Sequence, residues 1–332
     1  MWESYLSPGT VDWLLEPENP SVRFLTLTRL LGEPDSNPAV AEARTDIMRA
    51  GIVPQILAKL DNGSWNEPRR FYRDKYRGGV WQLIILAEHL ADGNEPRIHA
   101  VCEEILASSQ DRASGGFSYD ESAREGGGLH SGVVPCLTGN MVWSLLRLGY
   151  HDDERLQAGI DWITRYQRFD DGVECAPSGW PYDRYRMCWG THVCHMGAVK
   201  ALKALAEIPP DRRSPEACET IRAGCEYLLA HHIHKRSHDL AAVSRPGWLK
   251  LQFPLMYQTD VLEIAAILLD LGYRDERMQE AIDRIAAKRS NDGKWPLEAT
   301  FNGRYQVSVE QKGKPSRWIT LRALLVLKGY YR

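Results

Sequence analysis

The sequence lacks the features that most readily place a protein in a membrane, on nucleic acid or outside the cell. No apolar run is long enough to span a bilayer, and the opening Met1-Trp2-Glu3-Ser4 lacks the basic-then-apolar order of a signal peptide. A net charge of −3 and a pI near 6.4 argue against nucleic acid as a partner. Seven cysteines, an odd number without framework spacing, are typical of free thiols, so we expect a cytoplasmic protein.

The sequence also lacks the short motifs of several common active sites. It contains no glycine-rich phosphate loop, no nucleophile elbow and no paired-cysteine zinc knuckle. The aspartate pairs Asp152-Asp153 and Asp170-Asp171 resemble magnesium-diphosphate motifs, but both fall in turns that recur along the chain, so turn chemistry explains them better. Clues to function must therefore come from the repeats and from the places where they change.

A short glycine loop recurs along the chain. Its copies are Asp61-Asn62-Gly63-Ser64-Trp65, Ser114-Gly115-Gly116-Phe117, Asp170-Asp171-Gly172-Val173 and Asn291-Asp292-Gly293-Lys294-Trp295. The glycines at 63, 116, 172 and 293 are 53, 56 and 121 residues apart. The last step holds two periods of about 60 residues, which places a degenerate copy near 231–238. A period of this size is typical of a helical-hairpin repeat.

Each repeat predicts an apolar inner helix, a turn, an amphipathic outer helix and then the glycine loop. The third repeat is the clearest, with an apolar run at 137–148 and an amphipathic run at 154–166. The predicted inner helices cover 22–32, 79–91, 136–149, 188–206, 257–271 and 316–329. The first and last of them resemble each other, which favours ring closure. We therefore predict an all-α protein with essentially no sheet, in which a lead-in segment at 1–20 precedes one closed double ring of helices at 21–332.

The glycine loops, together with inner-helix openings such as Pro135-Cys136-Leu137-Thr138-Gly139-Asn140, resemble the α/α-toroid superfamily of terpene cyclases and prenyltransferase β subunits. The resemblance covers nearly the whole chain, and the loops look like the QW repeats of squalene cyclases. It implies a closed (α/α)6 toroid with its working cavity at the N-terminal ends of the inner helices. It also implies an isoprenoid-processing enzyme with a hydrophobic small-molecule substrate.

The resemblance points to Asp260 as the candidate acid. Class II cyclases place an Asp-x-Asp-Asp motif at the position of Tyr257-Gln258-Thr259-Asp260, and only the last aspartate is present here. An acid of this kind normally depends on neighbouring carboxylates for its acidity. We expect Asp260 to act as the acid beside Tyr257 and Tyr76, with an N-cap of the fifth inner helix as the alternative.

The opening of the fourth inner helix is the candidate metal site. Cys188-Trp189-Gly190-Thr191-His192-Val193-Cys194-His195 is similar in character to the segment that carries a zinc ligand in protein prenyltransferases. If the helix begins by Cys188, residues 188, 192 and 195 share one face. The predicted zinc ligands are Cys188, His192, His130, Cys136 and His195. The alternative is that these cysteines and histidines are core residues.

The degenerate repeat copy is the third candidate site. It reads His231-His232-Ile233-His234-Lys235-Arg236-Ser237-His238-Asp239, and a loop that departs from its own repeat family is a common place for function. We predict His234 as an acid or base and the two cations beside it as an anion cradle, with a solvated basic rim as the alternative. A cluster at 69–77 adds cations among aromatics. The predicted substrate contacts are Arg77, Arg317, Lys235, Arg236 and Trp189.

Three classes of function fit these patterns. An isoprenoid enzyme is preferred, and a non-catalytic ring that binds a ligand or a protein is the main alternative. A carbohydrate-active (α/α)6 barrel would need two carboxylates about 5–10 Å apart, for which Asp183, Asp260 and Glu310 are the few candidates. Under the preferred function we predict that one central cavity gathers Asp260, Tyr257, Tyr76, His192, Arg317 and His234.

Overall fold

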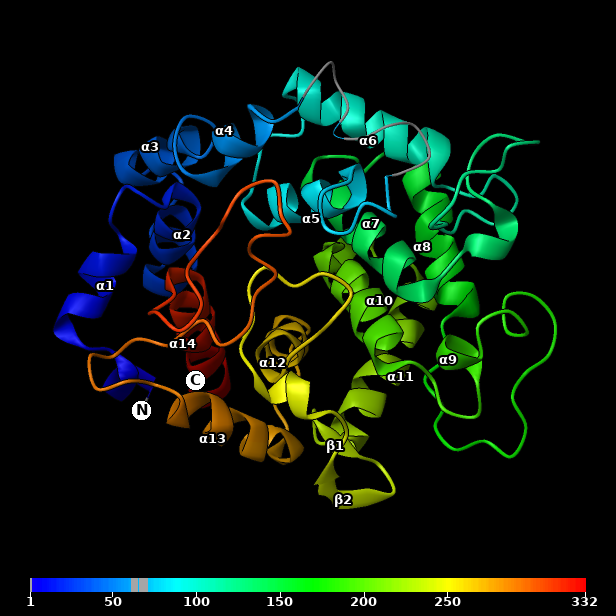
Figure 1. The fold of residues 1–332 in the computed structure, drawn as a ribbon. Coiled ribbons are helices and arrows are strands. Elements are labelled where there is room, and N and C mark those ends of the chain that lie inside the picture. The colour runs from blue at the N-terminus through cyan, green and yellow to red at the C-terminus, as the bar shows by residue number, and fades with distance from the viewer. Residues whose placement is uncertain (1, 61–64, 66–70) are drawn as a thin grey trace.

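The computed structural model describes residues 2–60, 65 and 71–332, and this part of the chain is mostly helical, as predicted (Figure 1). The α-helices are α1 (Pro8–Leu14), α2 (Pro20–Leu25), α3 (Pro38–Asp46), α4 (Ile52–Leu57), α5 (Gly79–Glu88), α6 (Pro96–Ser108), α7 (Pro135–Arg147), α8 (Glu154–Tyr166), α9 (Arg186–Trp189), α10 (His195–Glu207), α11 (Pro215–Ala230), α12 (Val261–Asp270), α13 (Gln279–Ala287) and α14 (Arg317–Tyr331). Short 3-10 helices lie at Trp2–Tyr5, His130–Gly132, Pro210–Arg212, Pro246–Leu249 and Glu276–Met278, a π-helix at Thr26–Leu31 continues α2, and strands β1 (Lys235–Arg236) and β2 (Asp239–Val243) pair as an antiparallel hairpin. Residues 61–64 of the first glycine loop, and Arg69 and Arg70, lie outside the described residues.

The helices form an inner set and an outer set. In Figure 1, α2, α5, α7, α10, α12 and α14 stand around the middle of the molecule, and the remaining longer helices lie outside them. The inner helices are buried on most sides, since every residue of α5 is buried. Outer helices such as α8 bury one face and expose the other. This difference explains why inner segments are apolar throughout and outer ones amphipathic. Within the described ranges, none of the helices combines the length and the apolar character that a membrane crossing requires.

The two ends of the sequence lie side by side. Helix α14 packs against α1, α2 and the π-helix at one side and against α12 and α13 at the other. The ammonium of Lys328 on α14 donates hydrogen bonds to the carbonyls of Arg29 (2.9 Å) and Leu30 (2.7 Å) in the π-helix. The last inner helix is therefore fixed directly to the first.

The glycine loops perform the same structural task in different repeats. Gly115, Gly172 and Gly293 all have a left-handed φ, between +68° and +83°, that glycine adopts without strain. The aromatic residue that follows the loop donates its backbone N–H to a threonine on the next inner helix. Phe117 donates to Oγ1 of Thr138 (2.9 Å), and Trp295 donates to Oγ1 of Thr320 (2.9 Å). Each loop thus anchors an outer helix to the inner helix that follows.

The fourth repeat departs from two predictions. A two-stranded hairpin stands where essentially no sheet was expected. The predicted helix at 188–206 is also broken, because α9 ends at Trp189 and α10 begins only at His195. The chain between them bends at 190–191 and is extended at 192–194, and bridges pair Trp189 with Val193 and Asp171 with His192. Residues 188, 192 and 195 therefore do not share one helical face, so this premise of the metal prediction was wrong.

We predict that the two anchoring threonines stabilise the fold. Thr138→Val and Thr320→Val keep the side-chain volume but leave a buried N–H without its acceptor, so each variant should lower the free energy of unfolding by about 1–3 kcal/mol. Urea unfolding of each variant tests this. The control is Thr45→Val, because Thr45 is exposed on α3 and bonds only within its own helix. Equal stability of all four proteins would remove the anchoring role.

Candidate thiol–histidine pocket

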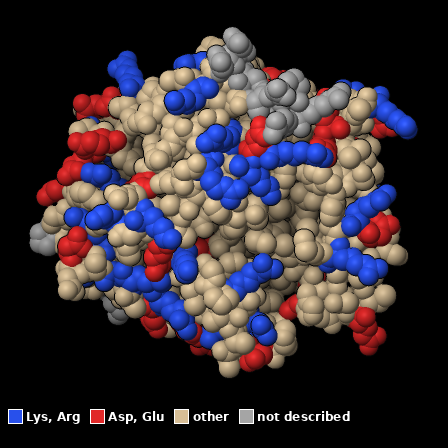
Figure 2. Space-filling model, in the orientation of Figure 1, with Lys and Arg blue, Asp and Glu red and all other residues tan. Residues whose placement is uncertain are grey.

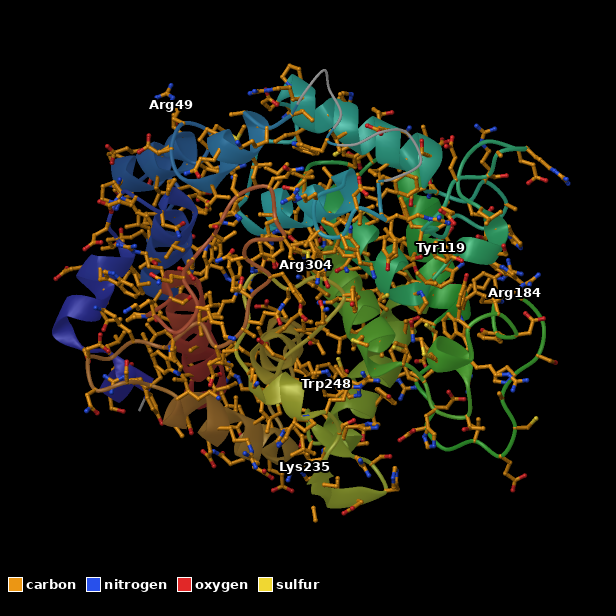
Figure 3. The ribbon with its side chains drawn as sticks, in the orientation of Figure 1. Arg49, Tyr119, Arg184, Lys235, Trp248 and Arg304 are labelled. Carbon is orange, nitrogen blue, oxygen red and sulfur yellow. The ribbon has the colours of Figure 1, made fainter. Side chains whose placement is uncertain are left out.

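A pocket of about 320 Å³ lies at the N-terminal end of α10, next to the β1–β2 hairpin. It joins the two segments that the sequence singled out, the opening of the fourth inner helix and the histidine-rich loop. Figure 3 labels Trp248 and Lys235 on this side of the molecule. We call it the thiol–histidine pocket. Its walls are Asp171, Met187, His192, Val193, Cys194, His195, Met196, Tyr227, His231, Arg236, Ser237, His238, Ser244, Arg245 and Trp248.

The local backbone explains why a thiol and a histidine face the same space. The chain bends at 190–191 and is extended at 192–194, and side chains two residues apart in extended chain point to the same side. His192 and Cys194 therefore both reach the pocket. Cys194 is also the N-cap residue of α10, where the unpaired backbone N–H groups of the first turn give a partial positive charge.

The carboxylate of Asp171 orients the polar groups of the pocket. It accepts hydrogen bonds from Nδ1 of His192, from Nε2 of His231 (3.1 Å) and from the hydroxyl of Ser237. Burial raises the pKa of Asp171, but the hydrogen bonds from Ser237 and His192 outweigh it and hold that pKa below its usual value. The carboxylate is therefore ionised. Because Nδ1 of His192 is the donor, its Nε2 is left as a base that faces solvent.

Cys194 has the properties of an activated thiol. The neighbouring Cys188 thiol, which donates toward the Cys194 sulfur, lowers the pKa of Cys194 most. Burial raises it, while the N–H groups of Gly197 and Met196 and the charge of Arg245 lower it further, to about 6. The sulfur makes no capping hydrogen bond of ordinary length, so the N–H groups act through their charge. The hydrogen bond between the two thiols thus lowers the pKa of Cys194 and raises that of Cys188, which favours the thiolate form at Cys194.

Two further features mark the pocket as a site for an anion. His195 is only 7% exposed, and its Nε2 has no hydrogen-bond partner among the described residues. Burial lowers the pKa of His195 to about 3, so the ring is neutral. Arg236 and Arg245 are exposed at the wall, and the guanidinium of neither forms a hydrogen bond or an ion pair with a carboxylate in the part of the chain that the structure describes. Free arginines of this kind are suited to a carboxylate or phosphate.

Only some of the predicted catalytic residues meet. Tyr76 and Tyr257 are hydrogen-bonded neighbours at the N-terminal mouth of the ring, where the edge of Tyr76 packs on Trp81 with ring centres 5.1 Å apart. The guanidinium of Arg304 lies 5.0 Å from the Tyr76 ring. Figure 2 shows Lys and Arg side chains gathered near the middle of this face, where Figure 3 labels Arg304. His192 lies apart from this mouth, in the thiol–histidine pocket.

Asp260 is the N-cap of α12. Its Oδ1 accepts from the N–H of Glu263 (2.8 Å) and its Oδ2 from the N–H of Gln252 (2.8 Å). The residue is 1% exposed and does not line the thiol–histidine pocket. The N-cap alternative is therefore confirmed, and both oxygens that a catalytic acid would need are engaged by the backbone.

Most of the remaining predicted residues form ion pairs at separate places in the molecule. Arg317 pairs with Glu16 and lies over the Trp13 ring at 4.9 Å. His234 and Lys235 both face Glu280, at 3.4 Å and 2.8 Å. The predicted convergence of six residues on one cavity was therefore wrong. Sequence spacing identified the helix openings, but ion pairs with outer elements turn these side chains away from the ring centre.

The predicted metal ligands and the last substrate contacts are also dispersed. Nδ1 of His130 donates a hydrogen bond to Oδ2 of Asp111 (2.7 Å), and the His130 ring stacks on Trp180 with ring centres 4.1 Å apart. Trp189 is fully buried, and Arg77 is exposed before α5. In the described ranges no group of three or more His, Cys, Asp or Glu side chains has a geometry that could hold a metal ion. The zinc prediction therefore finds no ligand set there: Cys136, Cys188 and Cys194 are free thiols.

Sequence reasoning missed three residues of the pocket. Asp171 was assigned to turn chemistry, Cys194 to the core, and Arg245 was not singled out. One signal was available for Cys194, because a cysteine directly before an apolar helix falls at the N-cap, where thiol pKa values drop. The roles of Asp171 and Arg245 depend on contacts between residues far apart in the sequence. Asp171 bonds to Ser237, which lies 66 residues further along, and Arg245 acts on Cys194. No local sequence pattern indicates such contacts.

A larger cavity of about 700 Å³ lies at the opposite ends of the inner helices. Its lining includes Glu88, Arg147 and Glu207, each the last residue of its helix, so it sits at the C-terminal ends and not at the predicted N-terminal ends. Charged side chains from all six inner segments face it. We call it the central cavity. Its charge does not suit the predicted hydrophobic substrate.

We predict that Asp260 makes stability depend on pH. Burial raises the pKa of Asp260 to about 6, above its value in the unfolded chain. Its contribution to folding is fully present below the unfolded pKa of 3.8 and is lost as pH rises through 6. Relative to Asp260→Asn, the wild-type chain should therefore lose up to about 3 kcal/mol of stability between pH 4 and pH 7.

Urea unfolding of both proteins at pH 4, 5, 6 and 7 measures this difference. Asp35→Asn is the matched control, because Asp35 is exposed and its replacement should give a flat difference. A flat or rising difference for Asp260→Asn would show that the buried carboxyl is not the titrating group.

Comparisons with known proteins give matches only among solved structures. No family model matches the chain, and no curated protein sequence matches it. A family 76 glycoside hydrolase α-mannanase of Bacteroides thetaiotaomicron is similar with a TM-score of 0.43 and 17% identity, over 80% of this chain and 70% of that chain. A family 76 glycoside hydrolase from a bovine Bacteroides thetaiotaomicron strain is similar with a TM-score of 0.47 and 14% identity, over 99% of this chain and 68% of that chain.

These matches correct the functional prediction. No family model, curated protein or similar structure points to the terpene cyclase and prenyltransferase superfamily, so this assignment is corrected, together with the isoprenoid function and the hydrophobic partner that it implied. The chain itself agrees, because charged side chains line both cavities described above. At 14–17% identity, neither the catalytic residues nor the substrates of those enzymes are carried over to this chain.

Proposed function

We propose that the chain is an enzyme that uses Cys194 as a nucleophile on a small anionic substrate. The observation that carries this proposal is the position of the Cys194 thiol. It stands at the start of α10, in a pocket that also holds an Asp171-oriented histidine and two arginines without ion pairs to the described residues. Thiol catalysis requires a nucleophile, a base that a carboxylate orients, and a positive charge that binds the anionic substrate.

The geometry suggests a role for each group. The Cys194 thiolate attacks an acyl carbon of the substrate and forms an S–C bond, while the bond to the leaving group breaks and the leaving group takes up a proton from solvent water. Water then attacks the acyl-enzyme, Nε2 of His192 accepts the proton of that water, and the thiolate is released. Asp171 keeps His192 in the tautomer that leaves Nε2 free. Arg236 and Arg245 hold the carboxylate or phosphate of the substrate.

The proposed enzyme is built on a closed (α/α)6 toroid in a reducing compartment. Closure is supported by the packing of α14 on α2 and by the hydrogen bonds from Lys328 to the π-helix. A cytoplasmic location is supported by the seven cysteines, all of which are free thiols. A low-pKa thiol keeps its activity only where oxidants are scarce.

Glycan hydrolysis, the activity for which the similar glycoside hydrolases are named, does not fit the described cavities. That reaction uses two carboxyl groups, one of which stays protonated. The thiol–histidine pocket offers only Asp171, whose pKa is lowered. In the central cavity, Glu88 and Glu263 are ion-paired and their pKa values are lowered as well. The pKa values of Asp171, Glu88 and Glu263 are thus shifted away from the raised pKa that protonation of a glycosidic oxygen demands. The other two acids of the central cavity, Glu207 and Asp270, are held in ion pairs with arginines.

Covalent labelling tests the proposed nucleophile. Cys194 should react with iodoacetamide along a titration curve centred near pH 6. At pH 5.5 its rate should exceed that of the exposed Cys175 and Cys218 by about tenfold. Mono-p-nitrophenyl succinate, an anionic acyl donor, should acylate Cys194 faster than the neutral p-nitrophenyl acetate. Mass spectrometry of tryptic peptides locates both modifications.

Two variants make the labelling test specific. Arg245→Ala should remove the preference for the anionic ester, while Arg184→Ala, a change at an exposed arginine outside the pocket, should retain it. Cys194→Ser should form no acyl-enzyme. If Cys194 reacts no faster than Cys175 at pH 5.5, or if succinylation is spread over all exposed thiols, the proposed function is refuted.

A further inference from the structure

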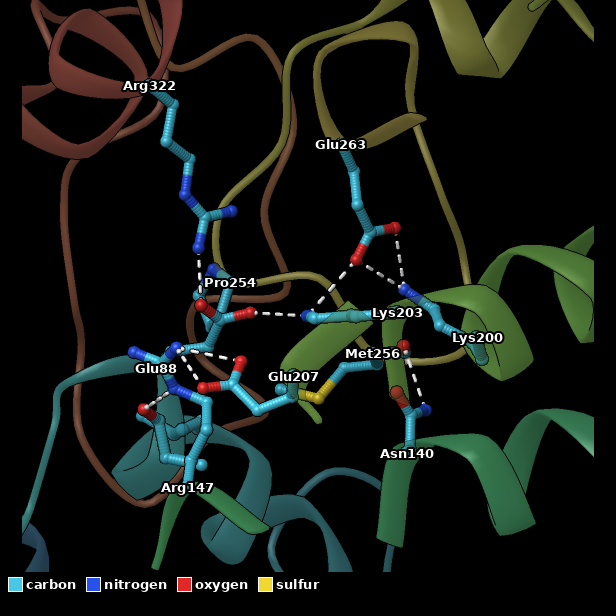
Figure 4. A network of polar contacts seen from close by, with 12 residues as sticks. Glu88, Asn140, Arg147, Lys200, Lys203, Glu207, Pro254, Met256, Glu263 and Arg322 are labelled. Atoms are coloured by element: carbon cyan, nitrogen blue, oxygen red, sulfur yellow. Dashed lines mark hydrogen bonds and ion pairs between the residues drawn. The ribbon is translucent and has the colours of Figure 1, made fainter. Parts of the chain in front are cut away.

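The central cavity is built around a network of buried charges (Figure 4). Glu88 at the end of α5 accepts hydrogen bonds from Lys203 on α10 (2.7 Å) and from Arg322 on α14. Glu263 on α12 pairs with Lys203 (3.1 Å) and, through both carboxylate oxygens, with Lys200 (2.8 and 2.7 Å). The network thus links four inner helices across the ring.

Stability alone does not account for this network. The side chains of Lys200, Glu263, Glu88 and Lys203 are 0%, 4%, 5% and 10% exposed, so four charges have lost most of their water. The attraction within buried ion pairs often fails to offset that desolvation, and apolar residues of similar size are frequently more stabilising. Charges retained at the wall of a 700 Å³ cavity are better explained by something that the cavity holds.

The charges that face the cavity are unbalanced. Seven Lys and Arg side chains and four Glu and Asp side chains line it. All four carboxylates already form ion pairs. Glu207 pairs with Arg147 and Asp270 with Arg29. Glu88 and Glu263 pair within the buried network. Backbone carbonyls at helix C-termini offset part of this surplus of positive charge, because the Lys328 ammonium donates to the carbonyl of Arg29 near the end of the π-helix. Arg332 interacts electrostatically with Glu3. Arg274 remains, with neither a hydrogen bond nor an ion pair to any described residue.

We infer that the central cavity is a second binding site, which takes a small organic anion bearing a carboxylate or a phosphate. Arg274 supplies the direct charge contact, and Arg322, fixed by Glu88, also lines the cavity. The site is separate from the thiol–histidine pocket, because the two share none of their lining residues. The inference therefore stands independently of the proposed thiol chemistry.

Ligand-induced thermal stabilisation at constant ionic strength tests the inference. The probes are citrate, glucose 6-phosphate, inorganic phosphate and, as the neutral control, glucose. At least one of the organic anions should raise the Tm in a saturable way, and glucose should not. A Tm shift with citrate alone would show that the cavity prefers a carboxylate, and a Tm shift with glucose 6-phosphate alone would show that it prefers a phosphate. If no organic anion gives a saturable shift, or if glucose gives the same shift, the inference is overturned.

Three variants locate the binding. Arg274→Ala should weaken the apparent affinity about tenfold, the usual cost of one charge-assisted contact. Because Arg274 supports no other described residue, the variant should keep the wild-type Tm without ligand. Arg49→Ala, at an exposed arginine outside the cavity, should bind like the wild type. Arg245→Ala removes the anion contact of the thiol–histidine pocket, so a shift that persists in this variant and is weakened in Arg274→Ala belongs to the central cavity. An effect of Arg245→Ala without one of Arg274→Ala would assign the anion to the other pocket and refute the inference.

Discussion

The carboxylate of Asp171 is the point on which the candidate active site depends. It receives donors from the extended segment before α10, from the end of α11 and from the loop of the β1–β2 hairpin, three segments that no regular secondary structure joins. A buried carboxylate with three donors is strongly held, and removing it would leave those donors unpaired. The same bonds keep α10 from starting at Cys188, and this delay places Cys194 at the helix N-terminus, where its sulfur meets the first-turn N–H groups.

The sequence was sufficient for the helices because their periodicity is a local property. The inner segments at 79–91 and 136–149 were apolar all round and correspond to α5 and α7, and the amphipathic run at 154–166 coincides with α8. The helix prediction failed in the fourth repeat, where contacts with other segments override the local helical propensity. The segment at 192–194 is extended because Asp171 and Trp189 pair with it, and the hairpin at 235–243 replaces a glycine loop. Contacts of this kind depend on the folded neighbours and leave no period in the sequence.

The resemblance to isoprenoid enzymes was misleading for a physical reason. The glycine-aromatic loops that carried it have a structural task, since Phe117 and Trp295 each give a backbone N–H to a threonine of the next inner helix. Any ring of helical hairpins gains from such an anchor, whatever it binds. Of the predicted site residues, His192, His195 and Arg236 do lie in one pocket. A departure from the repeat pattern marked Arg236, whereas the two histidines were predicted as metal ligands. Those placed by analogy with cyclases, Asp260 above all, serve the backbone.

Helix α10 connects the two cavities. Its first residue, His195, faces the thiol–histidine pocket, whereas Lys203 and Glu207 near its other end face the central cavity. Between them Lys200 is fully buried and held by both oxygens of Glu263 on α12. Burial lowers the pKa of Lys200, so loss of that carboxylate would favour its neutral form and release the helix from its neighbour. The ion pair therefore fixes the axial position of α10, and with it the distance between the Cys194 sulfur and the histidines that Asp171 orients.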